Sequence, residues 1–99
     1  MNDDELDRKV RSIGKSALVI HFDLFRSYFL GTLSKQQVIE QLVELGVSNE
    51  SGAAIRCSNA ILVFRAGREF DALQMVLDSK VDNELKIIAE QIIKDAAEH

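Results

Sequence analysis

The segment that decides the fold runs from Ser34 to Gly67 and reads SKQQVIEQLVELGVSNESGAAIRCSNAILVFRAG. Ser34 is a favourable N-cap residue, and Gln37 three positions later completes a capping-box pattern, which predicts the start of a helix. Apolar residues then recur at helical spacing, at Val38, Ile39, Leu42 and Val43. Gly46 suits the left-handed position that commonly ends a helix. The segment therefore begins with one short amphipathic helix.

A second helix is predicted to follow almost at once. Ser48 is a candidate N-cap only two residues after Gly46. A turn of roughly three to four residues containing a glycine is the spacing of a helix-turn-helix unit. We therefore predict a helix-turn-helix-like hairpin over residues 34–66.

The rest of the chain is also predicted to be helical. Its 99 residues correspond to a single domain, 1–99, and 46% of them are hydrophobic, enough to fill a core. The chain has no proline, which fits helices joined by short connections. The fold class expected is all-α, a compact bundle of about five helices near 3–13, 15–30, 35–45, 49–66 and 69–97, with the last span split near 79–81.

The most apolar segment, residues 17–30, is predicted to be the central core helix. Leu18, Phe22, Phe25 and Phe29 recur at positions i, i+4, i+7 and i+11, so they lie on one face of a helix. Such an aromatic stripe is far more often core than a ligand pocket. The side chains expected to be buried against each other are Phe22, Phe25, Leu42, Ile61, Phe64 and Leu73.

One pair of segments resembles a known repeat. Ala60–Phe64 and Asp71–Leu73, with Gly67 between them, resemble the helix hairpin of a tetratricopeptide repeat. The resemblance covers barely half of one repeat, and the sequence contains no second copy. Because stacked repeats need about three units to bury a core, we interpret the pair as a generic helical hairpin.

Few residues are suited to catalysis or metal binding. His21 lies in the apolar segment without a second His or Cys at ligand spacing, and the other histidine, His99, ends the sequence. We interpret His21 as a hydrogen-bonded boundary residue and Cys57, the single cysteine, as a small buried thiol. A glycine-rich phosphate loop is also lacking. The sequence therefore predicts a protein that is not an enzyme and that holds no cofactor or metal.

The sequence also predicts a cytoplasmic protein of bacterial type. Met1–Glu5 is acidic, the reverse of the basic start of a signal peptide. No apolar run approaches the roughly 20 residues needed to span a bilayer. We therefore expect no membrane association.

Charge is distributed unevenly along the chain. The net charge is −4, and residues 69–99 alone carry eight acids against three bases, a net of −5. An acidic surface repels nucleic acid and attracts basic proteins. The first functional hypothesis is a small acidic helical protein that binds a basic protein partner, as inhibitors, immunity proteins and antitoxins do. The acids expected to contact the partner are Asp78, Asp82, Glu84 and Glu90.

The alternative hypothesis is a helix-turn-helix DNA-binding transcriptional regulator. In such motifs the residues after the turn contact base edges in the major groove. Arg56 and Asn59 would then read bases, because Arg suits guanine and Asn suits adenine, and Arg65 and Arg68 would contact phosphate. Against this, residues 34–68 carry a net charge of only +1.

The end of the chain carries a regular apolar stripe that could form a homodimer contact. Within it, Leu85, Ile88 and Ile92 are expected to contribute to the interface. The stripe is too short for a sustained coiled coil, which needs at least three to four heptads.

Overall fold

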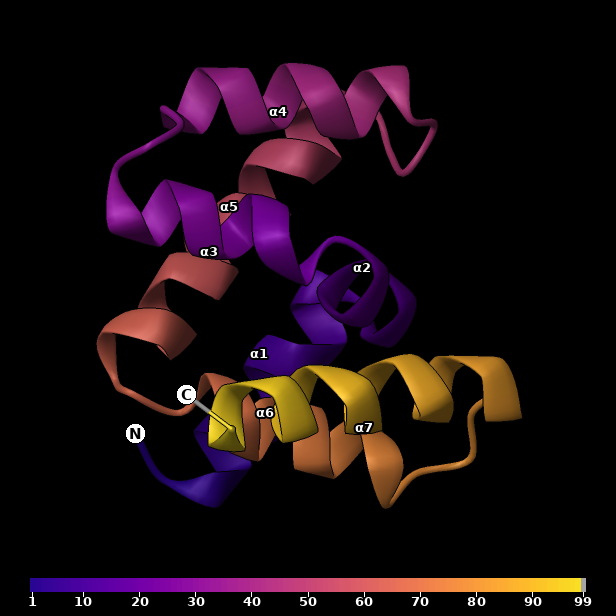
Figure 1. Cartoon of the computed structure of the whole chain (residues 1–99). Helices are drawn as coiled ribbons and strands as arrows, with labels where there is room; N and C mark the ends of the chain where they lie inside the picture. Colours follow the sequence, from indigo (N-terminus) through magenta and orange to yellow (C-terminus); the bar gives the residue numbers. More distant parts are fainter. Residues whose placement is uncertain (99) are drawn as a thin grey trace.

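The computed structural model describes residues 1–98, and His99 lies outside them. Within that range all regular secondary structure is helical, which confirms the all-α class (Figure 1). There are seven helices rather than about five, and their bounds are α1 Asp3–Ile13, α2 Lys15–Ile20, α3 Phe22–Leu30, α4 Lys35–Glu44, α5 Glu50–Arg65, α6 Glu69–Leu77 and α7 Asn83–Ala97.

The extra helices arise where two predicted spans are divided. The span 69–97 is split, as predicted, and its connection covers residues 78–82. The prediction of one helix over 15–30 was wrong, because His21, at φ −109° and ψ 25°, separates α2 from α3. The break has a packing consequence: α2 packs against α7, whereas α3 packs against α4 and α5. One straight helix could not direct both halves at these different partners.

The hairpin of α4 and α5 follows the sequence closely at its start. Ser34 and Gln37 form the predicted capping box, and Gly46 has the positive φ, 77°, expected of a helix-ending residue. The predicted N-cap of the second helix was wrong by one residue: Asn49, not Ser48, caps α5, and its Oδ1 accepts from the Gly52 amide at 2.8 Å. The connection is therefore five residues, 45–49, rather than three to four.

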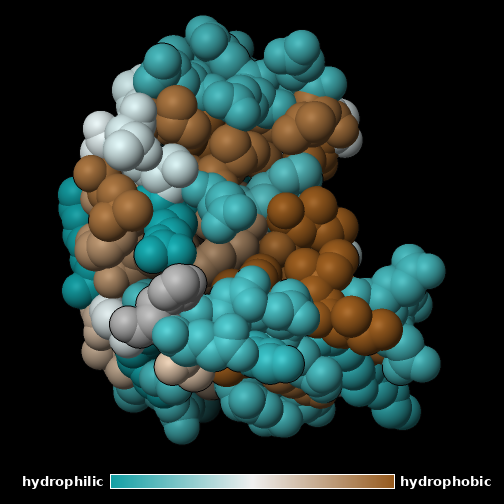
Figure 2. All heavy atoms as spheres, in the orientation of Figure 1, coloured by the Kyte–Doolittle hydropathy of each residue, from teal (hydrophilic) through white to brown (hydrophobic). Residues whose placement is uncertain are grey.

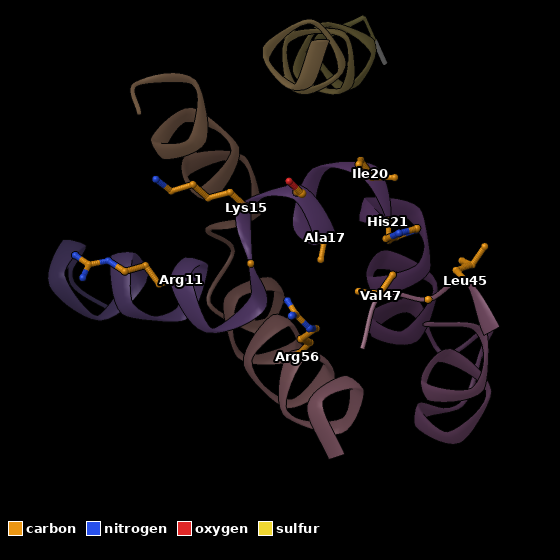
Figure 3. Close-up of a pocket in the computed structure, with 11 residues that line it drawn as sticks. Arg11, Lys15, Ala17, Ile20, His21, Leu45, Val47 and Arg56 are labelled. Carbon is orange, nitrogen blue, oxygen red and sulfur yellow. The ribbon is translucent and has the colours of Figure 1, made fainter. Parts of the chain in front are cut away.

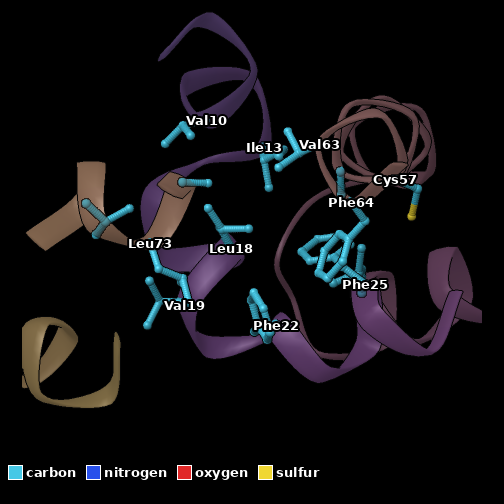
Figure 4. Close-up of a cluster of buried hydrophobic side chains, with 14 of the residues drawn as sticks. Val10, Ile13, Leu18, Val19, Phe22, Phe25, Cys57, Val63, Phe64 and Leu73 are labelled. Carbon is cyan, nitrogen blue, oxygen red and sulfur yellow. The ribbon is translucent and has the colours of Figure 1, made fainter. Parts of the chain in front are cut away.

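The core forms where α3, α5 and α6 meet α1 and α2 (Figure 4). The six predicted core residues are all buried, which confirms that prediction, although Ile61 lies outside the main cluster. Phe22 and Phe64 are the closest aromatic pair, with ring centroids 5.2 Å apart. Two residues of the predicted apolar stripes are instead exposed: Phe29 at 40% and Val43 at 42%.

An ion-pair cluster fastens the start of the chain to α6. Arg68 Nη2 lies 2.7 Å from Asp3 Oδ1, and Nη1 donates to the Met1 carbonyl oxygen at 3.0 Å. Arg68 Nε also pairs with Asp71 at 3.0 Å. Hydrogen bonds to the two carboxylates raise the pKa of Arg68.

Among the helices of residues 1–98, none has the length and apolar content needed to cross a bilayer.

The arrangement leaves a hollow on one side of the molecule. In Figure 1, α4 lies at the top and α7 at the bottom, with α2 and α3 between them. The space-filling view in the same orientation shows apolar side chains gathered in the hollow between α4 and α7 (Figure 2). This side of the molecule carries the surface features described next.

Candidate functional site

Helix α7 borders two hollows, one at each half of its length. The first hollow, of about 310 Å³, lies between the start of α7 and α2. Its lining residues are Ser16, Ile20, Val81, Asp82, Glu84, Leu85 and Ile88. The second hollow, of about 520 Å³, lies between the end of α7 and helices α3 and α6. Its lining residues are Phe22, Asp23, Arg26, Phe70, Ile92, Asp95 and Ala96.

The two hollows share no lining residue, but both are bordered by α7, and together we call them the α7 groove. Ile88 lines the first hollow and Ile92 the second, and residues four apart are neighbours on the same face of a helix. On the facing side, Ile20 precedes the break at His21 and Asp23 follows it. The groove therefore runs along most of α7, with α2 and α3 as its opposite wall.

The α7 groove combines exposed apolar side chains with carboxylates. Ile20 is 57% exposed, Ile88 41% and Phe70 36%. Four acids line the two hollows, whereas Arg26 is the single cation among their lining residues. The four acids are Asp23, Asp82, Glu84 and Asp95. An apolar segment flanked by basic residues would complement such a surface in both respects.

Only part of the predicted acidic site is brought together. Asp82 is the N-cap residue of α7 and Glu84 lies in its first turn, so both edge the first hollow. Asp78 ends α6 instead, where Gln74 donates to its Oδ1 at 3.1 Å. Glu90 is exposed on α7 but lines neither hollow. All four assignments stay predictions, and Asp82 and Glu84 are the two that line the α7 groove.

Two acids of the groove were missed by sequence reasoning. Asp23 follows Phe22 in a segment that was interpreted only as core, and it reaches the groove because the chain turns at His21. Asp95 stands three residues after Ile92, so helical spacing places both on one side of α7. The spacing between Ile92 and Asp95 could have indicated from the sequence that Asp95 lies in the groove. The position of Asp23 could not be predicted, because it depends on the helix break at His21.

The predicted dimer stripe forms a wall of the same groove. Leu85 is 7% exposed and belongs to the core of its own chain. Ile88 and Ile92 line the two hollows and remain partly accessible. The homodimer stays a prediction, to be tested by light scattering, and Ile88 and Ile92 are the more accessible of its three predicted contact residues.

A third hollow, of about 620 Å³, has the opposite charge (Figure 3). The turn residues Leu45, Gly46 and Val47 line one side of it. Its cationic lining residues are Arg11, Lys15 and Arg56. Arg56 Nη1 donates to the Ile13 carbonyl oxygen, and Arg11 is paired with Asp7. Two of the three cations are therefore already engaged within the protein.

The residues predicted to contact DNA do not form one free surface. Arg56 is half-buried against the end of α1, and Asn59 Nδ2 donates to the Ile55 carbonyl oxygen of its own helix at 2.9 Å. Arg68 is held by Asp3 and Asp71 at the other end of α5, whereas Arg65 is exposed. DNA contact stays a prediction, and these interactions already occupy part of the guanidinium groups of Arg56 and Arg68.

His21 and Cys57 have pKa values shifted by burial. Desolvation lowers the pKa of the half-buried His21. Burial raises the pKa of the Cys57 thiol, and the charge of Lys35 opposes this only in part. The thiol is fully buried, so it is poorly placed as a nucleophile. Within residues 1–98, no three His, Cys, Asp or Glu side chains gather as metal ligands would.

Comparisons of this chain with protein-family models, with curated proteins and with solved structures each found no match. The function is therefore inferred from the α7 groove, from its exposed apolar side chains and from its charged lining residues.

Proposed function

We propose that this protein acts by binding another protein, and that the α7 groove is the surface that binds it. The partner contributes an apolar segment flanked by lysine or arginine residues. The observation that supports this most directly is the pairing of exposed Ile20, Ile88 and Phe70 with four groove carboxylates. The role would be that of a small inhibitor, immunity protein or antitoxin.

Both properties of the groove contribute to binding in different ways. The apolar side chains provide affinity, because covering them removes apolar surface from water. The carboxylates provide orientation and speed of association, because they attract a basic partner before contact. The net charge of −5 over residues 69–99 extends this attraction beyond the groove itself.

The test is affinity capture from host cells followed by binding kinetics with the purified partner. The first variant is Ile88→Ser, which removes apolar contact, and the second is Asp82→Lys with Glu84→Lys. We expect Ile88→Ser to speed dissociation. Reversing the two charges should instead slow association, and the effect should shrink as salt is added.

A matched control reverses two acids on α4, Glu40→Lys and Glu44→Lys. Both residues are exposed, and neither lines the α7 groove. The proposal requires the control to change association less than the groove variant does. Capture of a protein whose binding is equally sensitive to both charge reversals, and insensitive to Ile88→Ser, would contradict it.

DNA binding is the second candidate. The observation that favours it is the basic hollow, where Arg11, Lys15 and Arg56 lie beside the turn between α4 and α5. DNA binding is the weaker of the two candidate functions. Arg56 is already hydrogen-bonded to Ile13, and Arg68 is already paired with Asp3 and Asp71.

A further inference from the structure

Four phenyl rings surround a small pocket beside the second hollow of the α7 groove. Phe22 and Phe29 come from α3, Phe64 from α5 and Phe70 from α6. Their ring centroids form a chain, 6.0 Å from Phe70 to Phe22, 5.2 Å from Phe22 to Phe64 and 5.6 Å from Phe64 to Phe29. The pocket has a volume of about 160 Å³, and its other lining residues are Arg26, Leu30 and Glu69.

Glu69 lines the same pocket, and one of its carboxylate oxygens has no hydrogen-bond donor. Its Oε2 is buried and has no partner among residues 1–98. A carboxylate in the first turn of α6 suits the positive end of a helix, but this does not account for a buried oxygen without a donor. An unpaired buried oxygen costs free energy, which a donor arriving from outside would recover.

Arg26 lines the same pocket but does not neutralise this group. The ion pairs of residues 1–98 involve Arg11 and Arg68, and none joins Arg26 to Glu69 within 4.0 Å. The pocket therefore offers an unpaired acceptor together with aromatic surface. Aromatic faces attract cations, and the attraction is largest where water is excluded.

We propose that this pocket binds the guanidinium group of an arginine from the partner. The guanidinium donates to the Glu69 carboxylate and stacks its planar face on a phenyl ring. This deepens the proposed function, on which it rests, because the pocket shares Phe22, Arg26 and Phe70 with the α7 groove. A basic residue beside the apolar segment of the partner would reach it from there.

The test uses small probes, so that it does not require the partner. Nitrogen-15-labelled protein is titrated with n-butylguanidinium chloride and with n-butylurea, which has a similar shape and no charge. Sodium chloride keeps the ionic strength constant. We expect the guanidinium probe to shift the amide signals of Phe29, Glu69 and Phe70, with an affinity about tenfold or more above that of the urea.

Two variants assign the effect to Glu69. Glu69→Gln keeps the shape and removes the charge, so it should weaken guanidinium binding about tenfold. Glu44→Gln, an exposed acid on α4 outside this pocket, is the matched control and should leave binding unchanged. Arg26→Gln should strengthen binding, because it removes a like charge from the pocket.

Equal binding of the two probes, or a Glu69→Gln variant that binds guanidinium as well as the unmodified protein, would overturn the inference. If Glu69→Gln fails to fold, the comparison of the two probes on the unmodified protein decides alone. The result is separable from the proposed function. Groove variants that leave partner affinity unchanged would contradict that function, whereas failure of the guanidinium probe would remove only the arginine pocket.

Discussion

Arg56 Nη1 donates a hydrogen bond to the backbone carbonyl oxygen of Ile13, the last residue of α1. The two residues are 43 positions apart, so this bond joins the middle of α5 to the end of α1. Gly14 makes the approach possible: its φ is +91°, and a Cβ there would overlap the Arg56 guanidinium. A cation is also favourable at this position, because the C-terminal end of α1 carries a partial negative charge.

Replacing Arg56 should therefore destabilise the fold. We expect Arg56→Ala to lower the free energy of unfolding by about 1–2 kcal/mol, because a half-buried carbonyl oxygen loses its charged donor. Urea denaturation measures the change. Arg65→Ala is the control, since Arg65 is exposed in the same helix and its loss should have little effect. Equal losses in the two variants would show that the Ile13 contact contributes nothing.

Phe64 is expected to be a major contributor to core stability. Its side chain is 4% exposed, and its ring contacts those of Phe22 and Phe29. Phe64→Ala should cost about 3–5 kcal/mol, from lost burial and the cavity left behind. Leu62→Ala is the control in the same helix, because Leu62 is 42% exposed. A loss below about 1 kcal/mol for Phe64→Ala would contradict the packing described here.

The core could be predicted from the sequence because it depends on local periodicity. Helical spacing of apolar residues identified Phe22, Phe25, Leu42 and Phe64 without knowledge of their partners. The break at His21 could not be predicted in this way. No Gly or Pro marks it, and it follows from the need of α2 and α3 to pack against different helices.

The candidate site was less predictable than the core, for a related reason. Asp82 and Glu84 were identified from the excess of acids in residues 69–99, which the sequence shows directly. Arg56 was interpreted as a base reader because it follows the turn in the sequence, whereas its contact with Ile13 joins distant parts of the chain. Glu69 was likewise not singled out, because the rings around it come from three separate helices. Contacts of this kind need the folded structure.

His21 should make stability depend on pH as the pH falls below its ordinary pKa of 6.5. Desolvation lowers its pKa below the ordinary value of 6.5, so in this range the unfolded chain binds more protons than the folded one. Stability contributed by neutral His21 is thus present above pH 6.5 and is lost as the pH falls through the folded pKa. We expect His21→Gln to lose less stability on acidification than the unmodified protein does.

Urea denaturation of both proteins at several pH values measures this difference. The carboxylates titrate in both, so their contribution cancels in the comparison. Identical slopes for the two proteins would show that protonation of His21 is not linked to folding. A steeper loss in His21→Gln would reverse the sign of the linkage and contradict desolvation as its cause.

DNA titration at low salt separates the second candidate function from the first. We expect no tight, sequence-selective binding to random-sequence or host genomic DNA. Arg56 and Arg68 are engaged within the protein, and the net charge of −4 opposes binding most strongly where salt screens it least.

DNA binding would predict the reverse in three measurable respects. Affinity would fall steeply with salt, because each neutralised phosphate releases counterions. Arg56→Ala would reduce sequence preference by about 1–3 kcal/mol for a lost base contact, and Arg68→Ala would weaken binding to all sequences alike. Because Arg56→Ala is also expected to destabilise the fold, its binding must be measured where the variant is fully folded. Salt-sensitive, sequence-selective binding of the unmodified protein would then favour DNA over the basic protein partner.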